Sequence, residues 1–246
     1  MDLSGKRAVV TGGGSGIGLH LARQLANEGA EVTLTGRNEA KLTAAAKAHE
    51  LFTPFVCDVT DDDRIQELVE TLDDKGGCDL LINNAGVFQA FDMTKSFSLE
   101  QQLLEVDIDV NGPLRMVHYF LPGMLKRESA IVNVSSGLAF VPLSMSPVYS
   151  ASKAFLHSWT QSLRAQLKGT SVRVIELMPP LVDTEMVAEM DPSLHRMPPE
   201  TLADAFMKGL RGSEDEITPG QSGQLKLMRR LAPGFIFGQL NKQPRG

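Results

Sequence analysis

Two kinds of apolar pattern alternate along the chain. Short, nearly continuous apolar stretches cover residues 7–11, 31–35, 53–57, 80–83, 130–135 and 172–178. Such stretches are typical of parallel strands that are buried on both faces. Between them lie longer stretches whose apolar residues recur every three or four positions, as in amphipathic helices. The alternation predicts an α/β fold: a doubly wound parallel sheet of the Rossmann type, with about seven strands and helices on both faces.

The predicted helices have recognisable ends. The first carries an apolar stripe from Leu19 to Ala26 and ends at Gly29. A later helix begins at Thr60 or Asp61, so we interpret the acidic residues 61–63 as capping its N-terminus rather than binding a metal. Two longer helices are predicted over residues 99–120 and 149–167.

Composition narrows the possible functions. The 246 residues are 42% hydrophobic and 22% charged, as expected for one domain that spans residues 1–246. A net charge of −6 argues against nucleic acid as a partner, because nucleic acids select basic surfaces. Cys57 and Cys78 form no CxxC pair and the five histidines lack ligand spacing, so no metal site is predicted. No apolar run approaches the roughly 18 residues of a membrane span, and the start resembles no leader, so we expect a cytoplasmic protein without an integral membrane segment.

The tail from about residue 221 to residue 246 differs from the rest of the chain. It contains five basic residues, no carboxylate and several large apolar residues; the basic residues are Lys226, Arg229, Arg230, Lys242 and Arg245. A basic amphipathic segment can bind membranes or acidic partners. We favour the alternative that it packs on its own domain or on a second subunit, because docked tails are common.

A glycine-rich loop follows the first predicted strand and opens the first helix. Residues 11–18 read TGGGSGIG, and a second strand completes a βαβ unit. Glycines let the backbone approach a pyrophosphate, and the helix N-terminus offers free amides and positive partial charge. The loop therefore predicts a dinucleotide site that includes Gly12, Ser15, Gly16, Ile17 and Gly18.

Three side chains are candidates for proton transfer. Tyr149 and Lys153 are four residues apart on a predicted helix, so both lie on one face. A nearby ammonium lowers the pKa of a phenol by favouring the phenolate, which suits acid/base catalysis. Ser136 follows the fifth predicted strand, at the sheet edge where ligands bind, and its hydroxyl can hold a substrate oxygen near Tyr149.

With these motifs in order, the chain resembles the short-chain dehydrogenase/reductase family over nearly its whole length. The matches are TGGGSGIG from Thr11, NNAG from Asn83, Ser136, and YSASK from Tyr149. The resemblance implies that Tyr149 exchanges a proton with the substrate oxygen and that Lys153 also holds the nicotinamide ribose. It implies that Asp58 reaches the adenine, although a turn residue at the strand end is an equal alternative. It also implies cofactor contacts for Val59, Asn84, Ala85, Gly86, Val182 and Thr184.

Two positions depart from the family pattern. Members usually carry an asparagine in the long helix after the fourth strand, where this chain has Asp109; a structural aspartate is the alternative. A carboxylate there would raise the pKa of Lys153 and offset part of its effect on Tyr149. The family's Pro-Gly after the sixth strand is Pro179-Pro180 here, which removes an amide donor beside the nicotinamide.

The end of the second strand indicates the cofactor. NAD-selective sites place an acid there for the ribose 2′-hydroxyl, whereas an arginine accommodates a 2′-phosphate. This chain has Gly36 followed by Arg37, which predicts NADP(H).

We expect an oxidoreductase that transfers a hydride between NADP(H) and a small-molecule carbonyl or alcohol. Phe140, Val141 and Met145 predict an apolar substrate pocket, with Val87, Phe88, Met186 and Met190 as neighbours. The family implies a homodimer or homotetramer. The alternative is a catalytically idle dinucleotide-binding sensor or an interaction protein that uses the basic tail.

Overall fold

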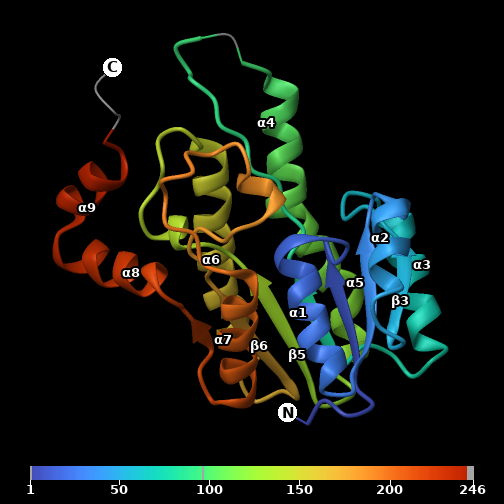
Figure 1. Ribbon diagram of the computed structural model, residues 1–246. Helices are drawn as coiled ribbons and strands as arrows, with labels where there is room; N and C mark the ends of the chain where they lie inside the picture. The colour runs from blue at the N-terminus through green and yellow to red at the C-terminus, as the bar shows by residue number, and fades with distance from the viewer. Residues whose placement is uncertain (1, 96, 243–246) are drawn as a thin grey trace.

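Seven parallel strands form one sheet in the order β3-β2-β1-β4-β5-β6-β7. The computed structural model describes residues 2–95 and 97–242, so Met1 and the last four residues of the tail, with Arg245, lie outside the described residues. The strands are β1 (Arg7–Thr11), β2 (Glu31–Gly36), β3 (Phe52–Val56), β4 (Leu80–Asn83), β5 (Ser129–Val134), β6 (Val172–Leu177) and β7 (Glu216–Ile217). The expected doubly wound sheet is therefore present (Figure 1). The chain reverses its strand order between β1 and β4, and the ends of these strands are where such folds bind ligands.

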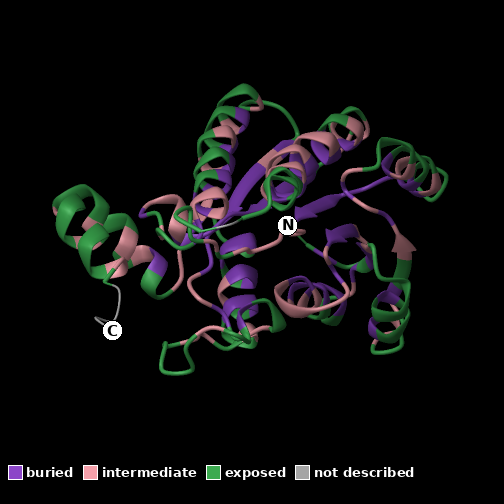
Figure 2. Cartoon of the chain, turned by 90° about the horizontal axis from the view of Figure 1, so that it is seen from above, coloured by how far each residue is buried: buried purple, intermediate pink, exposed green. Residues whose placement is uncertain are grey.

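Helices cover both faces of the sheet (Figure 1). One apolar core joins the sheet to α1 (Gly16–Asn27), α2 (Glu39–Ala46) and α7 (Pro199–Arg211). A second core joins the opposite face to α3 (Asp62–Asp73), α5 (Gly112–Met124) and α6 (Pro147–Gln166). Viewed from above, the central strands are buried and the outer faces of the helices are exposed (Figure 2).

The predicted strands lie within one residue of their expected bounds, but β3 is not buried on both faces. Thr53 and Pro54 are exposed, because β3 forms one edge of the sheet. A proline is acceptable there because an edge strand need not use every backbone donor. The expectation of full burial was wrong for this strand.

The long helix predicted over residues 99–120 is interrupted. It consists of α4 (Leu99–Val106), a π-helical segment over Asp107–Asn111, and α5. π-helical segments widen the turn by one residue and occur often at functional sites. Here the segment carries Asp109 into the interior, where its side chain is fully buried.

The basic tail forms two helices, α8 (Gln221–Leu231) and α9 (Pro233–Leu240), which extend from the body beside α7 (Figure 1). The tail packs on its own domain at Ser222, which is buried, while large apolar side chains remain exposed: Leu227, Leu231, Phe235 and Phe237. Among the helices of the described residues, none is both long and apolar enough to cross a membrane.

Candidate active site

The glycine-rich loop turns tightly between β1 and α1. Gly12 and Gly16 have φ values of 65° and 52°, which favour glycine. A Cβ atom on Gly18 would lie 2.5 Å from the Asn84 side-chain nitrogen, so the loop and the end of β4 are in close contact. Ser15 makes no side-chain hydrogen bond to the first turn of α1, so its hydroxyl does not occupy the amides there. Predicted residues 12–18 thus lie together at the N-terminus of a helix.

Thr11 joins this loop to the segment after β4. Its buried hydroxyl accepts hydrogen bonds from the amides of Asn84 and Ala85, each at 2.9 Å. The Asn84 side chain donates to the Thr11 carbonyl at 2.8 Å. These bonds fix Asn84 and Ala85, and with them the start of the segment that continues to Gly86, beside the glycine-rich loop.

The proposed proton-transfer residues meet where β5 and α6 approach each other. Ser136 is the second residue after β5 and is buried, while Tyr149 and Lys153 lie on one face of α6. The Lys153 ammonium lies 5.2 Å from the centre of the Tyr149 ring and donates a hydrogen bond to the Val134 carbonyl. Because β5 ends beside these groups, they lie at the carboxyl edge of the sheet, next to the loop after β4.

Asp109 reaches the same place from the π-helical segment. One carboxylate oxygen accepts a hydrogen bond from the Val87 amide at 2.8 Å, and the other lies 3.2 Å from the Lys153 ammonium. Gly86 covers the pair, since a Cβ atom there would lie 3.3 Å from both Asp109 oxygens. The structure therefore brings Asp109 beside Lys153.

Burial and charge act in opposite directions on these groups. Loss of water contact raises the pKa of Tyr149, Lys153 lowers it, and Asp109 raises it, with a net pKa above the ordinary tyrosine value. Burial lowers the pKa of Lys153, but Asp109 and Tyr149 raise it more strongly together, so the net pKa is also above normal. Burial raises the pKa of Asp109 despite the opposing effect of Lys153. In the protein alone, Tyr149 is a protonated phenol at neutral pH.

A second buried acid, Glu105, lies in this cluster and was not predicted. It occupies α4, one turn before Asp109, and accepts a hydrogen bond from the Gln89 amide at 3.2 Å. Burial and the Asp109 charge raise its pKa to about 7. Its only signal in the sequence is the spacing of four residues from Asp109, which is common on exposed helix faces.

The other predicted cofactor residues lie around the same edge of the sheet. Asp58 accepts hydrogen bonds from the backbone and hydroxyl of Thr60, and its other oxygen faces Arg37. Val59 is buried against Gly112. Thr184 lies beside Gly16, since a Cβ atom on that glycine would meet it at 3.5 Å.

The segment after β6 holds its position despite Pro180. The Pro179 carbonyl accepts a hydrogen bond from the Gly137 amide, and Val182, which is buried, pairs with Met197 as an isolated bridge. The double proline thus connects the segment carrying Val182 and Thr184 to the loop after β5.

Part of the predicted apolar pocket lies against the residues that we expect to transfer the proton. The Phe88 ring packs edge-on against Tyr149, with ring centres 5.2 Å apart. Val141 is buried, Met145 and Met186 are exposed, and Phe140 instead packs against His157. The wall around Tyr149 therefore combines the loop after β4 with the loop between β5 and α6.

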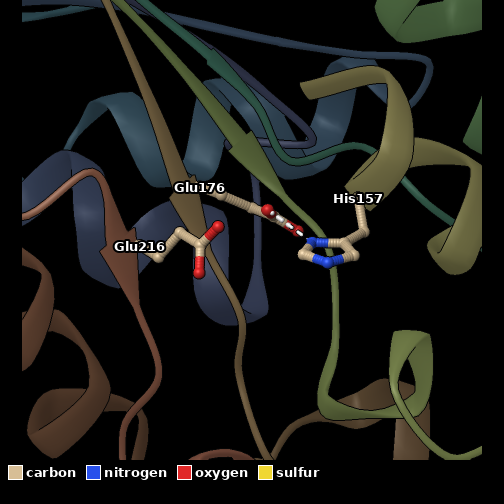
Figure 3. A group of neighbouring side chains, drawn as sticks. All are labelled: His157, Glu176 and Glu216. Carbon is tan, nitrogen blue, oxygen red and sulfur yellow. Dashed lines mark hydrogen bonds and ion pairs between the residues drawn. The ribbon is translucent and has the colours of Figure 1, made fainter. Parts of the chain in front are cut away.

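His157 lies in a cluster of side chains that was not predicted, because the histidines are scattered along the sequence. His157, Glu176 and Glu216 gather with ligand atoms within 4.8 Å of one another (Figure 3). The fully buried Glu176 accepts from Ser135 at 2.5 Å and pairs with His157 at 2.8 Å. Glu216 pairs with Lys226 at 2.5 Å and lies 3.6 Å from Arg164. Since cations or protons already satisfy both acids, the cluster is an ion-pair network that connects β6, α6, β7, the tail and the residue that follows β5.

Comparison with known proteins identifies the family. A model described as short chain dehydrogenase matches residues 6–194. The chain belongs to the short-chain dehydrogenase family. It is similar to the uncharacterized oxidoreductase DltE of Bacillus subtilis, at 35% identity over 99% of each chain. An uncharacterized oxidoreductase of Staphylococcus saprophyticus is 36% identical, over 86% of this chain and 93% of that protein.

Solved structures of the family have the same architecture. A short chain dehydrogenase of Burkholderia cenocepacia in complex with NADP has a TM-score of 0.88 at 28% identity, covering 99% of this chain and 100% of that one. A 3-ketoacyl-(acyl-carrier-protein) reductase of Brucella melitensis complexed with NADH has a TM-score of 0.79 at 27% identity, covering 86% and 92%. The resemblance stated from the motifs is confirmed at the level of family and fold.

Proposed function

We propose that the protein is an NADP(H)-dependent oxidoreductase that transfers a hydride between nicotinamide and the carbonyl or alcohol carbon of an apolar substrate. The observation that carries the proposal is the meeting of Ser136, Tyr149 and Lys153 beside the glycine-rich loop of a short-chain dehydrogenase. The reacting pair and the dinucleotide loop lie at the same edge of one sheet.

The residues present fit a nicotinamide dinucleotide. A Cβ atom on Gly12 would lie 3.0 Å from the Asn84 side-chain nitrogen, and a Cβ atom on Gly18 would lie 2.5 Å from the same nitrogen. These two positions therefore leave no room for a side chain. This leaves backbone amides at the start of α1 for a pyrophosphate. Thr184 lies beside the loop and can contact the phosphates, while Lys153 can hold the nicotinamide ribose.

The adenosine end supports NADP(H) over NAD(H). Gly36 ends β2, where an acid would otherwise repel a 2′-phosphate, and Arg37 follows it. Arg37 is exposed and faces Asp58, so its guanidinium is available at this end of the site. The similarity to the Burkholderia cenocepacia protein in complex with NADP is in agreement.

The bound cofactor would supply the hydride. Tyr149 donates its phenolic proton to the substrate oxygen when a carbonyl is reduced, and it takes that proton back when an alcohol is oxidised. The ammonium of Lys153 stabilises the phenolate that remains after proton donation. Ser136 donates a hydrogen bond to the substrate oxygen and holds it beside the phenol. Because the pKa of Tyr149 is raised, the phenol is protonated at neutral pH, as reduction requires.

Assembly and location stay predictions. We propose a homodimer or homotetramer, because Leu99 and Leu103 on α4 and four large apolar residues on α8 and α9 are exposed in the single chain. We also propose a cytoplasmic location, in agreement with the ordinary composition of the chain.

NADPH oxidation over a panel of aldehydes, ketones and quinones tests the function. We expect turnover with apolar substrates, and a loss of about 10²- to 10⁴-fold in Tyr149→Phe with NADPH binding retained. The matched control is Tyr119→Phe, which changes the other tyrosine of the chain. Near-normal turnover in Tyr149→Phe would contradict the assignment, and NADPH binding without turnover over the panel would favour a catalytically idle sensor.

A further inference from the structure

Two buried carboxyl groups, not one, lie behind the proton-transfer residues. Glu105 and Asp109 are both 0% exposed. They accept hydrogen bonds from amides of the same segment, at Gln89 and Val87, so they face the same side of the helix. The second oxygen of Glu105, Oε2, is buried with no hydrogen-bond partner among the described residues, whereas Asp109 Oδ2 faces the Lys153 ammonium.

A single ammonium compensates these two acids. Lys153 Nζ lies 3.2 Å from Asp109 Oδ2 and donates its hydrogen bond to a backbone carbonyl. The titratable groups that act on Glu105 are Asp109 and Lys153, with Tyr149 next to them on α6. His157, one turn further along α6, pairs instead with Glu176.

Two ionised carboxylates against one ammonium would leave an uncompensated buried charge. Such a charge is costly, and neighbouring buried acids usually avoid it by retaining a proton between them. An ionised carboxylate can only accept hydrogen bonds, whereas a protonated carboxyl group can also donate one. Burial and the Asp109 charge raise the pKa of Glu105 to about 7, which favours Glu105 as its carrier.

We propose that Glu105 is a positioning residue that carries the proton shared with Asp109, so that the pair presents one negative charge to Lys153 and Tyr149 at neutral pH. Above neutrality Glu105 releases this proton to solvent and a second negative charge appears near the phenol. That charge disfavours the phenolate, so the pair opposes the effect of Lys153 as pH rises. An asparagine at position 109 would remove one of the two charges. The consequence for catalysis rests on the proposed function, but the titrations below need neither cofactor nor substrate.

Infrared titration of the full chain tests the shared proton. We expect a protonated-carboxyl band that disappears near pH 7 in the unmodified protein and is absent in Glu105→Gln. In Asp109→Asn the band should disappear at lower pH, because the neighbouring negative charge is gone. Glu100→Gln, at an exposed acid of the same helix, should retain the band. A band that is unaffected by Glu105→Gln, or no band at pH 6, would overturn the proposal.

The effect on the phenol can be measured directly because the chain has two tyrosines. In a Tyr119→Phe background, the tyrosinate absorbance reports Tyr149 alone. We expect Glu105→Gln and Asp109→Asn each to lower its midpoint by about one pH unit. Glu105→Asp should restore it and Glu100→Gln should leave it unchanged. An unshifted midpoint in Glu105→Gln would refute the positioning role.

Activity then separates the two proposals. Tyr149 must be deprotonated to accept a proton from an alcohol, so its ionisation sets the limb on which alcohol oxidation rises with pH. This rising limb should move to lower pH in Glu105→Gln, in step with the tyrosinate midpoint. If the tyrosinate midpoint shifts while no substrate turns over in the unmodified protein, the shared proton stands and the proposed function fails. If the unmodified protein turns over substrate and the pH profile of this turnover is unchanged in Glu105→Gln, the positioning role fails and the proposed function stands.

Discussion

Arg37 and Asp58 face each other across the ends of β2 and β3, with Arg37 Nε 3.8 Å from Asp58 Oδ2. Asp58 is itself held by Thr60, which donates to it through the amide at 3.0 Å and the hydroxyl at 2.9 Å. The side chain of Arg37 is 56% exposed, so this ion pair adds little stability but keeps the guanidinium over the end of the sheet.

The first prediction concerns cofactor preference. A hydrogen bond to a charged group contributes about 1.5–3 kcal/mol, so we expect roughly a ten- to hundredfold preference in kcat/KM for NADPH over NADH. Arg37→Ala should remove most of it, and Gly36→Asp should reverse it by repelling the 2′-phosphate. Arg23→Ala, at an exposed position of α1, is the control. Equal kcat/KM values for the two cofactors in the unmodified protein would contradict this prediction.

The second prediction compares two buried threonines that are paired in register on β1 and β2. Thr11→Val leaves the amides of Asn84 and Ala85 without their acceptor, so we expect a loss of about 1–3 kcal/mol in the free energy of unfolding. Thr35 is equally buried, but its hydroxyl has no hydrogen-bond partner among the described residues. Thr35→Val should therefore be neutral or stabilising.

Urea unfolding of both variants makes this measurement. Equal destabilisation by the two substitutions would mean that Thr11 acts through packing rather than through its hydrogen bonds. NADPH affinity should fall in Thr11→Val alone, because Asn84 then loses its fixed position beside the glycine-rich loop.

The fold was largely predictable because most strands are short apolar stretches bounded by polar turns. β1 and β4 begin and end at the predicted residues, since glycine or polar residues bound each one. β7 has two residues, which is too short for a pattern, although about seven strands were expected. The edge position of β3 depends on which strands pair, and that is settled by contacts far apart in the sequence.

The site was predictable where a motif encodes it and not where tertiary packing does. Asp109 could be assigned from spacing, but the π-helical segment that carries it was not predicted. Glu105 has the sequence context of an exposed helix residue, and its burial arises because α4 packs against α6. In the same way, His157 and Glu176 are 19 residues apart and meet only when α6 crosses the sheet.

The third prediction is a pH dependence of stability from His157. Its hydrogen bond with Glu176 raises its pKa in the folded state, although burial opposes this. A raised pKa stabilises the fold fully below the unfolded value of about 6.5, and this stabilisation is lost as pH rises through the higher folded value. His157→Gln should therefore lower the free energy of unfolding by about 1.5–3 kcal/mol at pH 6, and by less at pH 9.

The measurement is the difference in unfolding free energy between each variant and the unmodified protein, because other groups such as Glu105 also titrate. His118→Gln, at an exposed position of α5, is the control for loss of an imidazole outside this cluster. A constant difference for His157→Gln would mean that His157 is neutral in the folded protein over this range.

The last prediction concerns the end of the tail. Asn241 accepts a hydrogen bond from the Ser144 amide at 2.5 Å and donates one to the Pro142 carbonyl at 3.0 Å. Both partners belong to the loop between β5 and α6, which also leads to Tyr149. Asn241→Ala should therefore loosen this wall of the proposed substrate site.

Loss of two hydrogen bonds of about 1 kcal/mol each corresponds to a 5- to 30-fold rise in KM. We expect kcat and NADPH affinity to be nearly unchanged, because the loop lies away from the glycine-rich segment. Gln239→Ala, at an exposed position of α9, should leave KM unaltered. Deletion of residues 221–246 should raise KM at least as much, since it removes Asn241 together with Ser222 against Gly137. If Asn241→Ala left KM unchanged while the deletion raised it, the contribution of the tail would come from Ser222 or from subunit assembly, and size-exclusion chromatography of the deletion variant would distinguish these two causes.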